Sequence, residues 1–113
     1  MSKTSKNADV YIELLRDLRN AEEAILSLPR GYISTKVISG HTYHYLQWRE
    51  GNQVLSTYVN DALLNSTKQQ IVIRKEYEEL VKILKKDLKK IEKSLLKAGY
   101  TKEEIDSLDE NKE

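Results

Sequence analysis

The sequence predicts an α+β domain in the order helix, three antiparallel strands, long helix, short final helix. Three observations predict it. Apolar residues recur every three or four positions in the outer parts of the chain, as on one face of a helix. Between residues 32 and 59 the period falls to two, as in strands. Two glycine turns, Ser39-Gly40 and Glu50-Gly51-Asn52, divide that middle stretch into three segments of strand length.

The first helix follows a polar stretch, residues 1–7, that we expect to be a flexible tail. Asn7 or Asp9 is suited to the start of the helix. Pro29 cannot continue it, and Gly31 completes the break. The apolar stripe that predicts this helix consists of Val10, Leu14, Leu18, Ala21, Ile25 and Leu28.

The three strands are expected near residues 32–38, 41–49 and 53–59. With two-residue loops, Tyr43 lies opposite Lys36, and Tyr45 opposite Ser34 and either Tyr58 or Ser56. Side chains alternate across a strand, so the meander has two different faces. The face expected to pack on the helices carries Ile33, Val37, His44, Leu46, Trp48, Leu55 and Val59. The opposite face carries Tyr32, Lys36, His41, Tyr43, Tyr45, Gln47, Arg49, Ser56 and Tyr58.

The long helix is predicted to begin near Asp61 or Ser66 and to end at Gly99, a residue suited to a left-handed C-cap. Thr101 to Glu104 is a capping-box signature for a last short helix that ends near Leu108. Residues 109–113 are expected to form a second flexible tail. No linker divides the chain, so residues 1–113 are predicted to form a single domain.

Composition excludes several classes of site. The chain has no cysteine, and therefore no disulfide, thiolate nucleophile or cysteine-based zinc site. Its net charge of +1 removes the simplest argument for nucleic-acid binding, although local patches remain possible. No apolar run approaches the roughly 18 residues that a membrane-spanning helix needs, and the polar start is not a signal peptide. We therefore expect a cytoplasmic protein without a membrane partner.

No constellation in the sequence predicts catalysis. His41 and His44, three residues apart on a strand, point to opposite faces and cannot readily share a metal ion. Neighbouring glutamates on the predicted helices diverge by about 100°, which is typical of surface charge rather than of a paired acid and base. No glycine-rich phosphate loop or nucleophile elbow is present. The expectation is a non-enzymatic protein with no catalytic residue, no metal and no cofactor.

The tyrosine-rich strands allow two interpretations. Cross-strand tyrosines stabilise a sheet, and a helix could half-cover them. Alternatively, the rings and their flanking cations form a recognition surface, because tyrosine and arginine are enriched at binding hot spots. Residues 82–97 carry seven lysines against two carboxylates, either as a solvated helix face or as a phosphate-contacting one. The candidate binding residues are Tyr32, Lys36, Tyr43, Tyr45, Gln47, Arg49, Tyr58, Lys82, Lys86, Lys89, Lys90 and Lys93.

The stretch from Leu28 to Val59 resembles a group of small uncharacterised prokaryotic domains, of the domain-of-unknown-function kind. Their pattern is Leu-Pro-x-Gly, a glycine turn, a Y-x-Y-L strand, an R-E-G-x turn and S-x-Y-V, followed by a long helix. The residues that carry the resemblance are Leu28, Pro29, Gly31, Gly40, Tyr43, Tyr45, Leu46, Arg49, Glu50, Gly51, Ser56, Tyr58 and Val59. Some relatives carry a cysteine-containing insertion in the first hairpin that this chain lacks, so no metal-linked property carries over.

The resemblance implies an origin in mobile or phage-linked regions but no established activity. In topology and turn spacing the strands are also similar to the three-stranded arm-binding domain of phage-type integrases, which enters DNA with its sheet. The first helix and the length of the second depart from that domain.

A small binding module with one of two partner classes is therefore expected. The first class is nucleic acid, bound by an accessory or regulatory protein of a mobile element. The second is a protein, such as a host nuclease blocked by a phage-type inhibitor of the anti-CRISPR kind. Self-association as a homodimer through the amphipathic helices belongs to the second class.

Overall fold

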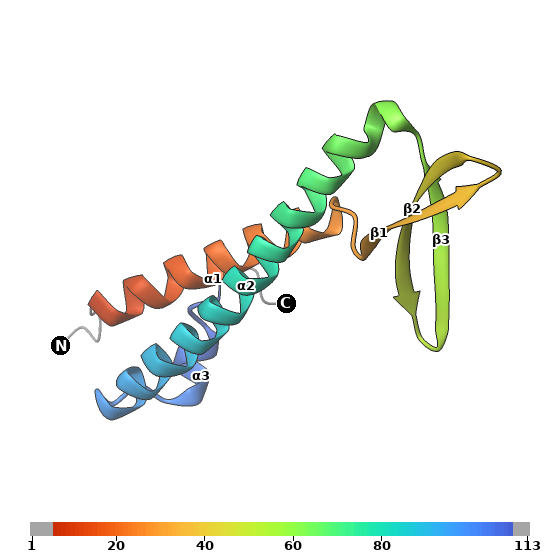
Figure 1. The fold of residues 1–113 in the computed structure, drawn as a ribbon. Coiled ribbons are helices and arrows are strands. Elements are labelled where there is room, and N and C mark those ends of the chain that lie inside the picture. Colours follow the sequence, from red (N-terminus) through yellow and green to blue (C-terminus); the bar gives the residue numbers. More distant parts are fainter. Residues whose placement is uncertain (1–5, 110–113) are drawn as a thin grey trace. The chain divides into compact units, whose positions relative to one another are not determined.

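The computed structural model describes residues 6–109, and Figure 1 shows their fold. The element order is α1 (Lys6–Leu26), β1 (Tyr32–Ile38), β2 (His41–Glu50), β3 (Gln53–Val59), α2 (Asp61–Lys97) and α3 (Lys102–Asp106). The predicted α+β class and order are confirmed. The chain forms two compact units, each described by itself. We call residues 24–77 the sheet unit, and residues 6–23 together with 78–109 the helical unit.

The strands form one antiparallel sheet in the order β1-β2-β3. Ile38 pairs with His41 and Glu50 with Gln53, so both hairpins have two-residue loops. The loop residues Ser39, Gly40 and Gly51 have positive φ, as primed hairpin turns require. The predicted pairs of Tyr43 with Lys36 and of Tyr45 with Ser34 are confirmed, and the second loop places Tyr45 opposite Tyr58.

Helix α1 begins at Lys6, so Lys6 and Asn7, expected in the first tail, are helical. Ala8 is only 4% exposed because it packs in the core of the helical unit, which keeps the first turn helical. Asp9 in that turn complements the positive end of the helix dipole. Residues 1–5 and 110–113 lie outside the described range. Asp109, expected in the second tail, forms an ion pair with Arg19.

Helix α2 begins at Asp61, where the Asn60 side chain accepts a hydrogen bond from the backbone of Ala62 at 2.9 Å. It ends in a Schellman motif. The backbone N–H of Tyr100 donates to the carbonyl of Leu95 at 3.0 Å, and that of Gly99, with φ of +102°, donates to Leu96 at 3.1 Å.

Helix α3 has the predicted capping box. The Thr101 hydroxyl accepts from the backbone of Glu104 at 3.1 Å, and the Glu104 carboxylate accepts from the backbone of Thr101 at 3.0 Å. The helix ends at Asp106, two residues before the predicted end near Leu108.

The buried core of the helical unit joins its three helices. Ala8 of α1, Leu95 of α2 and Ile105 of α3 meet there with Tyr100, and Leu95 is fully buried. Burying side chains of this size stabilises a fold by roughly 1.5–3 kcal/mol each. Tyr11, Ile91 and Leu108 pack against the cluster.

The apolar face of the sheet is less buried than predicted. Val59 is 7% exposed, but Leu46 and Trp48 are only half-buried, and Val37 is 69% exposed. The expectation that this whole face is a core face is therefore wrong at Val37. Val37 lies near the Ser39-Gly40 turn at the end of the hairpin and does not line the groove that Leu46 and Val59 border.

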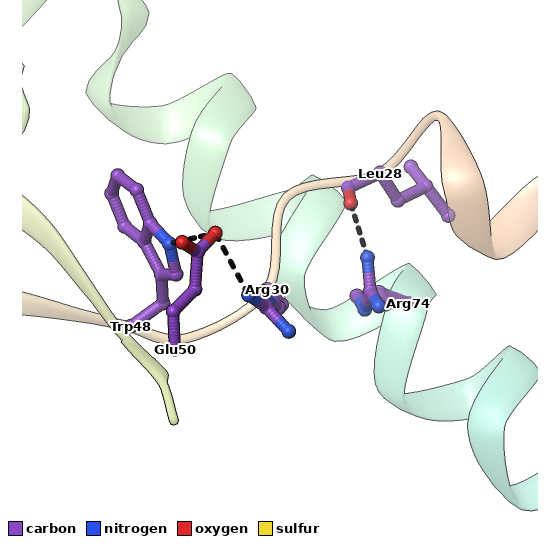
Figure 2. A network of polar contacts seen from close by, with 5 residues as sticks. All are labelled: Leu28, Arg30, Trp48, Glu50 and Arg74. Carbon is purple, nitrogen blue, oxygen red and sulfur yellow. Dashed lines mark hydrogen bonds and ion pairs between the residues drawn. The ribbon is translucent and has the colours of Figure 1, made fainter. Parts of the chain in front are cut away.

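Polar contacts hold the start of β1 in the sheet unit (Figure 2). The Arg74 Nη1 atom donates to the carbonyls of Ile25 and Leu28, at 2.9 and 2.6 Å, across the C-terminal end of α1. Arg30 and the Trp48 indole both donate to Glu50, at 3.1 and 3.3 Å. These contacts join α2 to the segment that follows α1, and join that segment to the central strand β2.

A single glycine sets the entry of the chain into β1. A Cβ atom built on Gly31 lies 1.9 Å from the Gln47 carbonyl oxygen, and φ at Gly31 is +106°. Both the conformation and the close approach exclude a side chain at this position.

None of the helices in the described range is long and apolar enough to cross a membrane.

Candidate nucleic-acid interface

The candidate site is the polar aromatic face of the sheet, which we call the tyrosine face. The register brings its candidate residues into rows across the strands. Tyr45 lies between Ser34 and Tyr58, Gln47 lies between Tyr32 and Ser56, and Tyr43 pairs with Lys36. Side chains alternate along each strand, so this face also carries Ile38, His41, Arg49 and Val54.

Three contacts join four rings on this face into a chain. The Tyr58 ring lies 6.4 Å from that of Tyr43 and 6.0 Å from that of Tyr45, both edge to face. The His41 ring lies 6.5 Å from Tyr43. Such contacts contribute about 0.5–1.5 kcal/mol each beyond area burial, and they restrict the ring orientations. The face therefore presents ordered rings before any partner arrives.

The tyrosine face carries positive and no negative side chains. The Lys36 Nζ atom sits 5.1 Å from the Tyr45 ring centroid, in cation–π range, and Arg49 is exposed. Neither side chain is ion-paired with a described residue. Glu50, the nearest carboxylate along β2, points to the opposite face, where it pairs with Arg30. An anion approaching this face meets no repulsion from a carboxylate on it.

The rings are accessible. Tyr32 and Tyr58 are 56% and 55% exposed, and Tyr43 and Tyr45 are half-buried. Tyr43 and Tyr45 both contact the Tyr58 ring, and Lys36 lies over the ring of Tyr45. The interpretation that a helix half-covers this face finds no support, because no ring of the tyrosine face is buried.

The other candidate residues lie on α2, within the helical unit. At about 100° per residue they occupy one arc of the helix, opposite the side where Leu84 and Leu95 are buried. Lys82 lies 3.6 Å from Glu79, at ion-pair distance. This lysine arc is a second candidate surface. Its exposed members are Lys82, Lys86, Lys89, Lys90 and Lys93.

The histidines separate as predicted. His41 lies on the tyrosine face, whereas His44 lies on the apolar face, where its Nδ1 atom is 3.1 Å from the Thr35 hydroxyl. Within residues 6–109 no group of three or more histidine, aspartate and glutamate side chains is arranged to hold a metal ion.

The opposite face of the sheet borders an open groove of about 610 Å³ in the sheet unit. Its walls come from Leu28, Pro29, Leu46, Thr57 and Leu63, among others, and none of its lining residues is charged. The groove offers apolar contact area but no acid, base or cation. The tyrosine face therefore has more of the chemistry needed for recognition.

Two features of the site were not among the predicted binding residues. His41 extends the ring cluster; strand alternation places it on this face, but no local pattern indicates its ring contact with Tyr43. Arg74 fixes the connection that leads into β1, but it does so through carbonyls 46 and 49 residues away in sequence. No local pattern signals such a contact.

A family model matches residues 11–70 of the chain, which include all three strands and the whole tyrosine face but not the lysine arc. No curated protein and no solved structure matches the chain. The expected likeness to an uncharacterised domain group is thus confirmed at the level of the family, whereas neither the detailed motif pattern nor the likeness to integrase arm-binding domains is. The chain belongs to the family described as Domain of unknown function DUF6788.

Proposed function

We propose that the chain is a non-enzymatic binding module that contacts nucleic acid through its tyrosine face, as an accessory or regulatory protein of mobile-element type. One observation carries the proposal. Ordered, accessible tyrosine rings share a face with Lys36 and Arg49, and that face has no carboxylate, although the chain contains 18 acidic residues.

The chemistry of the face fits a single strand best. Tyrosine rings can stack on exposed bases whatever the sequence, and each such contact is worth about 1–3 kcal/mol. Lys36 and Arg49 flank the rings on neighbouring strands, at positions suited to phosphates. Two cations are few for tight duplex binding, which depends on many phosphate contacts. Affinity is therefore expected to come mainly from the rings, with a modest dependence on salt.

Fluorescence anisotropy with a labelled single-stranded oligonucleotide tests the proposal. Tyr45→Val keeps a residue with high strand propensity but removes the ring, and should weaken binding about five-fold to one-hundred-fold. Lys36→Gln with Arg49→Gln should lower the slope of log affinity against log salt by about 1.4.

The matched control is Lys68→Gln with Lys75→Gln, which removes two exposed cations of the same unit from α2. This pair should leave both the affinity and the salt slope close to wild type. Equal losses in the two double variants would show non-specific charge attraction and would overturn the proposal.

A protein partner is the second candidate, as for an inhibitor that blocks a host nuclease. The exposure of Tyr32 and Tyr58 favours it, because accessible tyrosines are typical of protein-binding hot spots. Absence of binding to single-stranded and duplex oligonucleotides at low salt would reject nucleic acid and leave this second function.

A further inference from the structure

The outer edge of β3 is an unprotected strand edge. Natural edge strands are usually shielded by a charged residue, a proline or a bulge. Strand β3, with the sequence QVLSTYV, has no charged residue and no proline. Its pairing with β2 runs without interruption from Gln53 to Val59, so it has no bulge. The other edge strand, β1, carries Lys36.

The backbone of this edge is available for pairing. Residues opposite each other in an antiparallel ladder alternate between hydrogen-bonded and non-hydrogen-bonded pairs. Every second residue of β3 therefore turns its N–H and C=O away from β2. No other strand in the described range pairs with β3, which lies along an edge of the sheet in Figure 1.

The side chains of β3 are complementary to a second copy of the same strand. If two β3 strands pair antiparallel about Ser56, each Val54 lies opposite the partner's Tyr58. Val54 and Tyr58 are each 55% exposed in the single chain. Pairs of an aromatic and a β-branched residue are among the favourable cross-strand combinations. Leu55 of one copy would face Thr57 of the other, and no like charges would meet.

We propose that two copies of the chain join through their β3 edges into one six-stranded sheet, centred on Ser56. A two-fold axis perpendicular to the sheet keeps the same face of both copies on the same side. The two tyrosine faces therefore become one continuous surface, with Tyr58 of each copy near the centre. This dimer does not depend on the proposed nucleic-acid function, because it is held by the backbone N–H and C=O groups of the β3 edge, whereas nucleic acid would contact the tyrosine rings; the side chains of Val54, Ser56 and Tyr58 lie on the tyrosine face.

Disulfide trapping tests this register, since the natural chain contains no cysteine. Directly opposed residues of an antiparallel pair have Cα atoms about 4.5–5.5 Å apart, within the roughly 4.4–6.8 Å that a disulfide spans. Ser56→Cys should form a covalent dimer in a glutathione redox buffer. The matched control is Ser34→Cys, on the same face of the other edge strand, which should stay monomeric. Equal dimer yields for the two variants, or none for Ser56→Cys, would overturn the proposal.

Sedimentation equilibrium supplies an independent measurement on chains without cysteine. Dimer should increase with concentration up to about 1 mM, a range that covers weak complexes. Ser56→Lys places two ammonium groups opposite each other and should raise the dissociation constant at least ten-fold, whereas Ser34→Lys should not. A wild-type chain that stays monomeric, or a dimer unaffected by Ser56→Lys, would reject the β3 interface. Oligonucleotide binding by a strictly monomeric chain would leave the proposed function standing.

Discussion

Replacing Arg74 by methionine should destabilise the sheet unit, because it removes the hydrogen bonds that connect α2 to the end of α1. Arg74 donates to the carbonyls of Ile25 and Leu28 from a partly buried position. The last turn of α1 has no basic residue of its own, so Arg74 supplies the cation that the negative end of the helix dipole favours. Methionine keeps most of the apolar stem and removes the donors.

The size of the effect follows from the contacts. A hydrogen bond from a charged donor contributes about 1.5–3 kcal/mol. The two carbonyls lie at a helix end and can partly regain water, so the expected loss is about 2–4 kcal/mol in the free energy of unfolding. For a domain of this size, about 1 kcal/mol corresponds to roughly 4 °C. The melting temperature of the chain should therefore fall by about 8–16 °C.

Urea denaturation followed by tryptophan fluorescence suits the measurement. Trp48 is the single tryptophan of the chain and, with Arg74, lines a hollow of about 300 Å³ in the sheet unit. Arg16→Met is the matched control, because Arg16 is exposed on α1 in the helical unit, and it should change stability by less than about 0.5 kcal/mol. Equal changes in the two variants would refute the structural role assigned to Arg74.

Two further predictions concern stability. Gly31→Ala should lower the free energy of unfolding by more than about 3 kcal/mol, because the new Cβ would lie 1.9 Å from the Gln47 carbonyl oxygen. Gly40→Ala has open space around the new Cβ, so it should lower that free energy only by the roughly 1–2 kcal/mol that a positive φ costs. Equal losses in thermal melts would show that the close approach has no effect. Burial of the Tyr11 side chain is the main cause that raises the pKa of its hydroxyl above 10.0, and nearby carboxylates raise it further. The neutral hydroxyl is therefore favoured in the folded chain. Stability should be fully present below pH 10 and be lost as pH rises through the higher folded pKa, and Tyr11→Phe should flatten this loss. An unchanged alkaline profile in that variant would contradict the assignment. The carboxylates concerned are Glu92, Asp106 and Asp109.

Local chemistry accounts for the parts of the fold that could be predicted. Glycine and asparagine at the hairpin turns fixed the loop lengths, and the loop lengths fixed which side chains share a face. The choice between Tyr58 and Ser56 opposite Tyr45 stayed open, because either end of the sequence Glu50-Gly51-Asn52 can form the turn. The structure selects Gly51-Asn52, with Gly51 at positive φ.

Features that depend on distant segments could not be predicted. Alternation identified an apolar sheet face, but the burial of each residue on it depends on contacts with segments distant in the sequence, and Val37 is exposed. The contact of Arg74 with Ile25 and Leu28 joins residues far apart in the chain. The candidate site was accessible to sequence reasoning because all its residues lie on one short meander. Its ring contacts, and the pairing of Glu50 with Arg30 on the opposite face, depend on side-chain positions in space and could not be predicted from the sequence.

Mapping of backbone amide chemical shifts during titration with a single-stranded oligonucleotide tests the central claim most directly. We expect perturbations concentrated at Lys36, Tyr43, Tyr45, Arg49 and Tyr58, with smaller changes at residues of the opposite face such as Leu46 and Leu55. Perturbations confined to the lysine arc of α2, or a spectrum unchanged by the oligonucleotide, would contradict it.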